Sequence, residues 1–253
     1  MRYLLSFLLC FGSSVLAEDP LQQKFKQTYT LEQTGTMSVE NIDGSIRIYC
    51  WSEPEVKVEA IKKAYSAERL SQIAIDVAAT PKSLTVKTKF PPQPDWWSFR
   101  DRSGTVDYTI IAPQSVKITN MSLANGDLLI EGLRGGSATA SLSNGRIAAH
   151  NSFGDLHLRV ANGALDIFYD WWEEMLFSLD LAITNGGIRA ILPGAAKINL
   201  DAETVKGNIT SDFGKNRFKE SCVKTLQTST FGESAPKWKL RSVNGNIRLE
   251  AFY

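Results

Sequence analysis

Apolar and polar residues alternate through long stretches of this sequence. Leu156, Leu158 and Val160 are separated by polar residues. The same spacing recurs at Ile247 and Leu249, close to the C-terminus. Alternation over four to eight residues is typical of a β-strand that buries one face. Because such stretches recur along most of the chain, the pattern predicts an all-β protein.

A short turn motif, Asn-Gly followed by any residue and then Ile or Leu, recurs between these stretches. Asparagine and glycine tolerate the positive φ angles of tight turns, so each copy predicts a turn. Counted from Gly126, the motif glycines are spaced by 19, 18, 23, 21 and 38 residues, and the last spacing is twice 19. The residues assigned to these turns are Asn41, Gly44, Asn125, Gly126, Asn144, Gly145, Asn162, Gly163, Asn185, Gly186, Gly207, Asn244 and Gly245. Such near-constant spacing predicts a repeat architecture.

Two architectures fit a repeat of this length: a meander of hairpins, or a coil in which each turn of chain stacks on the previous one. Gly135 and Gly154 stand between the motif copies and are accompanied by apolar residues at matching offsets. Stacked rungs need this pattern, since each rung buries its inner face against its neighbours. We therefore favour a single-stranded, β-helix-like β-solenoid with rungs of about 18–23 residues, regular mainly over residues 121–212.

The segment that precedes the repeat has a different pattern. It predicts strands at residues 36–39, 46–51, 56–60, 75–78, 84–90 and 105–111, with an exposed loop at 91–101. Residues 66–74 predict a short helix with Ser66 as its N-cap. We expect this N-terminal part, residues 18–115, to pack onto solenoid repeats at 116–253, so that one continuous domain covers about 36–250.

The first 17 residues have the pattern of a secretory signal peptide. Arg2 precedes an apolar run, and small residues end the segment at Ala17. That run is too short to span a bilayer, and no later stretch reaches the length of a membrane helix. We expect cleavage after Ala17 and export to the periplasm or the cell surface. Loss of Arg2 leaves 27 basic residues against 27 acidic ones, so the mature chain has no basic footprint for nucleic acid.

Two cysteines, Cys50 and Cys222, remain once the signal peptide is removed. In an oxidising compartment such a pair is a disulfide candidate. If the rungs stack in chain order, at about 4.8 Å per rung the two residues lie roughly 24 Å apart. A disulfide needs Cα atoms within about 7 Å. Either both thiols are free, or the N-terminal strands fold back beside the C-terminal end.

The sequence offers little for catalysis, and we expect no catalytic residue, cofactor or metal site. His150 and His157 are its only histidines, and strand alternation places them on opposite faces. Nucleophile-elbow, His-Glu-x-x-His and phosphate-loop motifs are absent. Four aspartates on successive half-rungs could form an acid–base pair, hold a cation or simply support turns; they are Asp127, Asp155, Asp166 and Asp170.

Two pairs of adjacent tryptophans stand outside the regular repeat. Trp96 and Trp97 lie on the predicted exposed loop, and Trp171 and Trp172 lie in an insertion at residues 168–177. Neighbouring rings on a loop are difficult to bury together, and exposed aromatic residues often mark binding surfaces. The four tryptophans are therefore candidate partner-binding residues. Alternatively, each pair covers an open end or side of the solenoid.

With its Asn-Gly-x-Ile copies and the strand at 108–112 followed by Pro113, the sequence resembles a bacterial family of adhesin-like domains of unknown function. The resemblance covers residues 36–249. It implies an exported or membrane-attached β-solenoid preceded by strands and a short helix, and it implies no particular activity. The insertion at 168–177 and the missing turn copy between Gly207 and Gly245 depart from the family pattern.

Three functions fit these features. The first is a non-enzymatic, adhesin-like protein that binds an envelope protein or a glycan through its long face and its tryptophan loops. The second is a structural or envelope-stress component that assembles with itself or with a membrane protein through a solenoid edge. The third is a glycan-active enzyme with stacked carboxylates, which the positions of the four aspartates distinguish from the other two.

Overall fold

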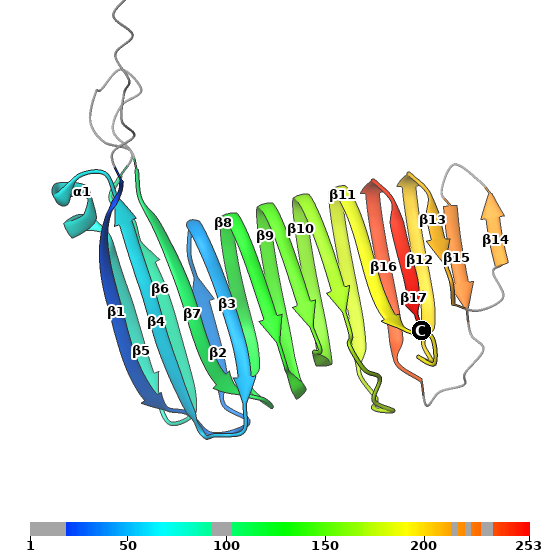
Figure 1. The fold of residues 1–253 in the computed structure, drawn as a ribbon, viewed down its shortest axis with the longest axis horizontal. Coiled ribbons are helices and arrows are strands. Elements are labelled where there is room, and N and C mark those ends of the chain that lie inside the picture. Colours follow the sequence, from blue (N-terminus) through cyan, green and yellow to red (C-terminus); the bar gives the residue numbers. More distant parts are fainter. Residues whose placement is uncertain (1–18, 93–102, 214–216, 221–223, 229–234) are drawn as a thin grey trace, which may run out of the picture.

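The computed structural model describes residues 19–92, 103–213, 217–220, 224–228 and 235–253. These residues form a nearly all-β protein, an elongated stack of strands with one short helix at one end (Figure 1). The elements are β1 Leu21–Thr30, β2 Thr36–Glu40, β3 Asp43–Trp51, β4 Glu55–Ala64, α1 Ala67–Gln72, β5 Ala74–Thr80, β6 Ser83–Lys89, β7 Thr105–Pro113, β8 Lys117–Glu131, β9 Arg134–His150, β10 Phe153–Phe168, β11 Ser178–Pro193, β12 Asn199–Lys206, β13 Ile209–Ser211, β14 Arg217–Glu220, β15 Lys224–Thr228, β16 Lys237–Asn244 and β17 Ile247–Phe252.

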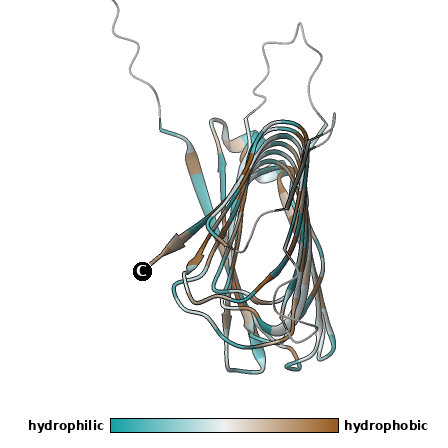
Figure 2. Ribbon diagram, turned by 90° about the vertical axis from the view of Figure 1, so that its right-hand side faces the viewer, coloured by the Kyte–Doolittle hydropathy of each residue, from teal (hydrophilic) through white to brown (hydrophobic). Residues whose placement is uncertain are grey.

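The middle of the molecule is a regular, solenoid-like stack. β8, β9, β10 and β11 pair in parallel, and each Asn-Gly pair lies directly beside the next along the stack. The motif glycine of each of these long strands has a positive φ. Figure 2, viewed along the stack, shows the strands bending as nested arcs. Inside the bends, equivalent apolar side chains pack on each other, as Leu128, Ile147 and Leu165 do, all at most 1% exposed. The parallel register supports stacked rungs over a meander of hairpins.

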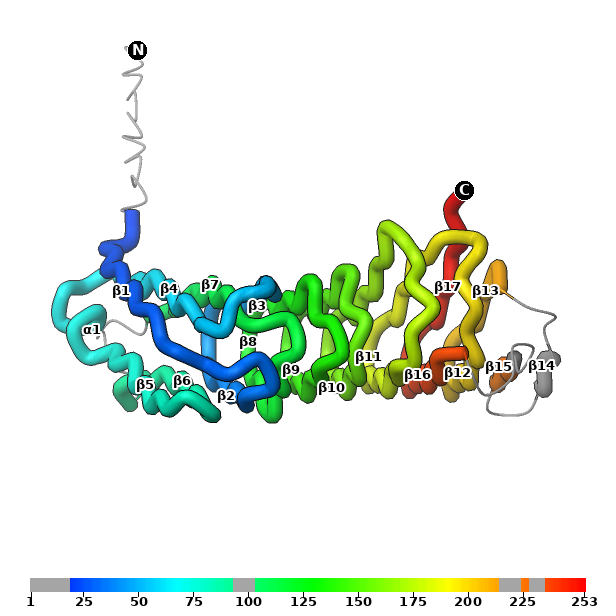
Figure 3. Tube along the Cα trace, turned by 90° about the horizontal axis from the view of Figure 1, so that it is seen from below, coloured from blue at the N-terminus to red at the C-terminus, as the bar shows by residue number. Residues whose placement is uncertain are grey.

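The N-terminal strands form two layers at one end of this stack (Figure 3). β3 lies between β7 and β8, and β2 lies between β6 and β8. The first turn copy is therefore part of the stack, and the boundary placed at residue 115 falls inside one sheet. Antiparallel neighbours extend the layers outward, with β4 beside β7 on one side and the β5–β6 hairpin on the other.

The strands and the helix predicted for the N-terminal part are confirmed. α1 begins after Ser66, whose side chain accepts a hydrogen bond from the backbone N–H of Arg69, as expected of an N-cap. β1, in contrast, was not predicted. Its ten residues are mostly polar and exposed because it is an edge strand that pairs only with β4. With neither face fully buried, it lacks the alternation by which strands are predicted.

The order of rungs at the C-terminal end is not the chain order. β16 and β17, red in Figure 1, lie between β11 on one side and β12 with β13 on the other. The prediction of linear stacking up to residue 212 is therefore wrong at its last rung. The pairing of the strands also explains the long spacing between Gly207 and Gly245, so no lost copy of the turn motif is needed. Part of that chain forms the antiparallel strands β14 and β15, and the last strands then return into a gap in the stack.

Candidate functional site

The asparagines of the turn motif form a continuous ladder on the outer surface. Each side-chain amide donates a hydrogen bond to the side-chain oxygen on the neighbouring rung, over distances of 2.8–3.1 Å. The ladder runs through Asn244, Asn185, Asn162, Asn144 and Asn125 and ends on the carboxylate of Asp43. Because a carboxylate only accepts hydrogen bonds, Asp43 is a suitable terminus for a ladder whose amides all donate in the same direction.

Asn41, one of the predicted turn residues, is not part of the ladder. In this copy of the motif, two residues, Ile42 and Asp43, stand between the asparagine and the glycine. Asp43 directly precedes Gly44 and therefore aligns with Asn125. Asn41 is buried instead, and its amide donates to the carbonyl of Val106 at 2.8 Å. Asn41 is therefore not equivalent to the ladder asparagines. It lies between β2 and β3, and its amide also donates to the carbonyl of Asp43, at 3.2 Å.

The glycines of the motif permit the close approach of successive bends. Gly163 has a φ of +140°, and a Cβ atom on it would lie 1.8 Å from the carbonyl oxygen of Gly145. The other motif glycines, from Gly44 to Gly245, show the same contact at 1.7–2.2 Å. No side chain fits at such a distance, so these positions serve the fold.

The four aspartates do not come together. Asp155 accepts hydrogen bonds from the backbone and hydroxyl of Ser178, and Asp166 pairs with Arg146 at 2.6 Å. Asp170 pairs with His150, and Asp127 is exposed. Among the residues that the structure describes, no group of three or more His, Cys, Asp or Glu side chains could hold a metal ion. Asp155, Asp166 and Asp170 therefore each interact with a different partner.

Both histidines lie on the outer surface, which corrects the expectation of opposite faces. The alternation is interrupted between them, because β9 ends at His150 and the chain turns at Asn151 and Ser152 before β10 begins. His150 lies between Glu131, at 3.5 Å, and Asp170, at 2.8 Å. A hydrogen bond from Asn151, with further contributions from His150, holds the pKa of Asp170 below its usual value.

The insertion between β10 and β11 forms a loop with a buried base. We call residues 169–177 the aromatic loop. The ring of Tyr169 is fully buried, and its hydroxyl donates to the carbonyl of Ser152 at 2.7 Å. Next to it, Asn151 exchanges two hydrogen bonds of 2.8 Å with Asp170. Trp172 packs edge-on against Tyr169 and lies beside the buried Trp238.

The two tryptophans of the aromatic loop therefore differ. Trp172 belongs to the edge of the core, which supports the covering role for this ring. Trp171 is 45% exposed and Leu176 is 73% exposed, so the loop presents one aromatic and one aliphatic side chain to solvent. Trp171 is held by a hydrogen bond from its indole nitrogen to Glu173, and Glu173 in turn pairs with Arg134. Sequence reasoning treated the adjacent rings alike and missed Leu176.

A cavity of about 330 Å³ opens at the base of this loop. Trp172, Met175 and Leu176 line one side of it, and Ala235 and Pro236 line another. Lys197 and Glu174 also line the cavity and form an ion pair of 3.0 Å. An apolar group of moderate size could enter here beside two exposed apolar side chains.

The remaining predicted site residues are placed only in part. Trp96, Trp97 and Cys222 lie outside the described residues. Cys50 is a free thiol, and burial, with an added contribution from Glu131, raises its pKa to about 12. A thiol of this kind is protonated at neutral pH and is a poor nucleophile.

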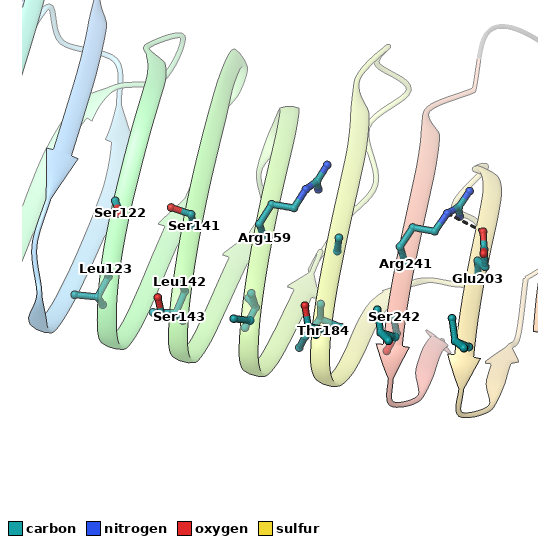
Figure 4. A pocket seen from close by; sticks show the side chains of 16 residues that line it. Ser122, Leu123, Ser141, Leu142, Ser143, Arg159, Thr184, Glu203, Arg241 and Ser242 are labelled. Carbon is teal, nitrogen blue, oxygen red and sulfur yellow. Dashed lines mark ion pairs between the residues drawn. The ribbon is translucent and has the colours of Figure 1, made fainter. Parts of the chain in front are cut away.

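A second hollow was not predicted from the sequence. It is a groove of about 510 Å³ that crosses β8, β9, β10, β11, β16 and β12 just before their bends (Figure 4). We call it the outer groove. Its lining includes Ser122, Ser141, Ser143, Arg159, Ala161, Ala182, Thr184, Glu203, Val205, Arg241 and Val243. Each residue is unremarkable in the sequence, because the groove exists only once six strands lie side by side.

Comparison with known proteins places the chain in a family. Residues 24–250 match the family described as Toastrack DUF4097. The chain belongs to this Toastrack family. A search of the curated proteins gives no match. The family match begins at residue 24, within β1, whereas the turn copies led us to expect a start at residue 36.

A search of the solved structures finds chains similar to this Toastrack protein. A "putative cell adhesion protein" from Clostridium sporogenes is similar with a TM-score of 0.52 and 10% identity, covering 91% of this chain and 100% of that one. A "putative adhesin" from Bacteroides fragilis gives a TM-score of 0.33 at 12% identity, covering 92% and 100%. A "putative lipid binding protein" from Parabacteroides distasonis gives 0.32 at 8% identity, covering 89% and 96%. No helix among the described residues has the length and apolar character needed to cross a membrane.

Proposed function

We propose that this Toastrack protein is a non-enzymatic, adhesin-like protein of the bacterial cell envelope, exported by a signal peptide at residues 1–17. In this proposal a single-stranded β-solenoid serves as a rigid scaffold and the aromatic loop contacts a protein partner. The similarity to a protein described in terms of cell adhesion agrees with a binding role. The observation that carries the proposal is the exposure of Trp171 and Leu176 beside an apolar cavity, on a loop whose base is fixed.

A fixed base matters because ordering a flexible loop on binding costs free energy. The aromatic loop is held at its start by Tyr169 and by the paired hydrogen bonds of Asn151 and Asp170. Its exposed side chains are therefore arranged before a partner arrives, which reduces the entropy lost on association. Tryptophan is also among the residues most enriched at the energetic centres of protein interfaces.

The proposal is tested by comparing two double variants in a capture experiment. Mature protein carrying Trp171→Ser and Leu176→Ser is immobilised, and proteins captured from the cell's own envelope are quantified by mass spectrometry. The matched control carries Leu21→Ser and Tyr65→Ser, which remove side chains that are 46% and 60% exposed at the other end of the molecule. We expect the loop variant to lose a defined partner that wild type and control retain. Equal capture by all three proteins would remove the aromatic loop from the proposal.

Assembly through a sheet edge is a second candidate function. β5 pairs only with β6, and β1 pairs only with β4, so each of these strands has one edge without a partner strand among the described residues. The β5 edge is short of protective charge, since its sequence is Ala-Ile-Asp-Val-Ala-Ala-Thr. Sedimentation equilibrium of wild type and Val77→Pro decides between the candidates. A wild-type oligomer that the variant loses would favour assembly, and a monomer in both would oppose it.

A further inference from the structure

The outer groove has a repeating character that differs from an ordinary small-molecule pocket. It runs across six strands, and every strand contributes side chains from equivalent positions before the bend. Neighbouring strands in a sheet are about 4.8 Å apart, so equivalent backbone positions recur about every 4.8 Å along the stack. The side chains at one such position differ, as Ser141, Arg159 and Ala182 do. A ligand that fills it with equivalent contacts would be linear and would itself repeat at close to that spacing.

The lining of the outer groove combines apolar side chains, among them Leu142, Val160 and Ile183, with hydroxyl groups and three charged residues. Ser141, Ser143 and Thr184 supply hydroxyl groups, while Ala161 and Ala182 leave room between them. The small side chains explain why the surface is hollowed along the middle of the stack. Such a lining can make hydrogen bonds to hydroxyl or amide groups and van der Waals contacts to aliphatic C–H groups.

The two arginines of the groove are already paired, so they do not make it an anion site. Arg159 binds the Asp180 carboxylate at 2.7 Å, and Arg241 binds Asp201 at 2.6 Å and Glu203 at 3.1 Å. Figure 4 shows the side chains of Arg159 and Arg241 reaching in the same direction along the stack. These pairs hold the guanidinium groups in place, and Arg carries five N–H donors in all, so donors remain for a neutral ligand.

The asparagine ladder adds a second repeating feature next to the groove. Asn144, Asn162 and Asn185 follow Ser143, Ala161 and Thr184 directly in the chain. Each ladder amide uses one N–H for its neighbour. An amide has two N–H donors and an oxygen with two lone pairs, so each of these oxygens keeps one acceptor site for solvent or a ligand. The amide nitrogen of Asn162 also donates to the carbonyl of Ser143, at 3.5 Å. The ladder residues are exposed and held in one orientation by their mutual hydrogen bonds.

Other linear polymers fit this surface less well. An extended peptide advances about 3.3 Å per residue, so its groups would fall out of step with the rungs. A single-stranded nucleic acid needs a positively charged groove with aromatic stacking platforms. Both arginines of the lining are paired with carboxylates, and no lining residue is aromatic. A chain of equatorially linked hexoses advances by close to one rung per sugar and offers hydroxyls along its edges and C–H groups on its faces.

We propose that the outer groove binds a neutral, extended polysaccharide that lies along the stack beside the asparagine ladder, with about one sugar per rung. This site is separate from the aromatic loop. It gives the protein a glycan contact in addition to the protein contact proposed above, and either contact can fail without the other.

The test is titration calorimetry of the mature protein with defined oligosaccharides. The probes are chitohexaose and cellohexaose, the disaccharide of each, and hexagalacturonate as a charged comparison. We expect at least one neutral hexasaccharide to bind about tenfold more tightly than its disaccharide, because it spans more rungs. Absence of binding by both neutral hexasaccharides at millimolar concentration, or tighter binding of hexagalacturonate, would overturn the proposal.

Two double variants locate the binding. Ala161→Gln with Ala182→Gln fills the groove with bulkier neutral side chains. Ala148→Gln with Ala164→Gln makes the same chemical change beyond the bends of β9 and β10, outside the groove lining. The first should weaken hexasaccharide binding at least about tenfold, and the second should leave it within about twofold. Equal affinities for both variants would place the glycan elsewhere and contradict the proposal. Val243→Gln, at a groove residue that is 45% exposed, provides a further groove variant with little risk to folding.

Discussion

The substitution Gly163→Ala tests the close stacking of the bends. A φ of +140° costs an L-residue about 1–3 kcal/mol. The new Cβ would also lie 1.8 Å from the Gly145 oxygen, and relieving such overpacking costs about 1–3 kcal/mol more. A total near 4 kcal/mol is a large part of the about 5–15 kcal/mol by which proteins of this kind are stable. For a chain of this size it lowers Tm by about 8–16 °C.

Gly135→Ala is the matched control for this prediction. Gly135 also has a positive φ, +70°, but a Cβ atom there would have nothing within 4 Å. Only the backbone cost applies, about 1–2 kcal/mol, or a fall in Tm of about 2–8 °C. Thermal unfolding followed by circular dichroism separates the two variants. If Gly163→Ala is no less stable than Gly135→Ala, the stacked glycines do not constrain the fold as we argue.

Three further predictions concern stability and reactivity. Asn162→Ala removes two ladder hydrogen bonds and should cost about 1–3 kcal/mol in urea unfolding, whereas Thr184→Ala on the same surface should cost much less; similar losses would mean that the ladder adds no stability. In a Cys222→Ser background, the thiol of Cys50 should react with Ellman's reagent at pH 8 only after unfolding, because its pKa is raised to about 12; fast reaction of the folded protein would contradict this. Partial burial raises the pKa of Asp180, but the hydrogen bond and charge of Arg159, with the charges of His157 and Lys239, outweigh it and lower the pKa overall. The resulting stabilisation is therefore present above the unfolded pKa of about 3.9 and is lost as pH falls below it. The Tm difference between wild type and Asp180→Asn should accordingly shrink below about pH 4. A Tm difference that stays constant with pH would refute the assignment.

The sequence predicts the repeating part of the fold well, for a physical reason. Each bend needs a glycine and flanking apolar residues, so the sequence repeats with a near-constant period, and Gly145, Gly163 and Gly186 follow this period. Elements without a periodic or alternating pattern were missed. β1 has glutamines between the apolar residues Leu21, Phe25 and Tyr29 of its one apolar face. Asp43 stands directly before Gly44, where the aligned copies have asparagine.

A candidate site can be predicted from the sequence only where its residues lie in one continuous segment. The aromatic loop stands out as a break in the repeat, and its insertion at 168–177 was identified. Burial then separates its tryptophans, since Trp172 packs at the core edge and Trp171 does not. That distinction depends on Tyr169 and Trp238, which meet Trp172 from the end of β10 and from β16.

The outer groove shows why chain order alone cannot give such a site. Arg241 and Val243 of β16 lie beside Ala182 and Thr184 of β11, about sixty residues earlier in the chain, because the last strands enter the stack before β12. Stacking in chain order would place β12 against β11 and would put Glu203, not Arg241, beside Ala182. The groove would then have a carboxylate at that position and a different balance of charge. The insertion of β16 between β11 and β12 therefore determines which side chains line this part of the groove.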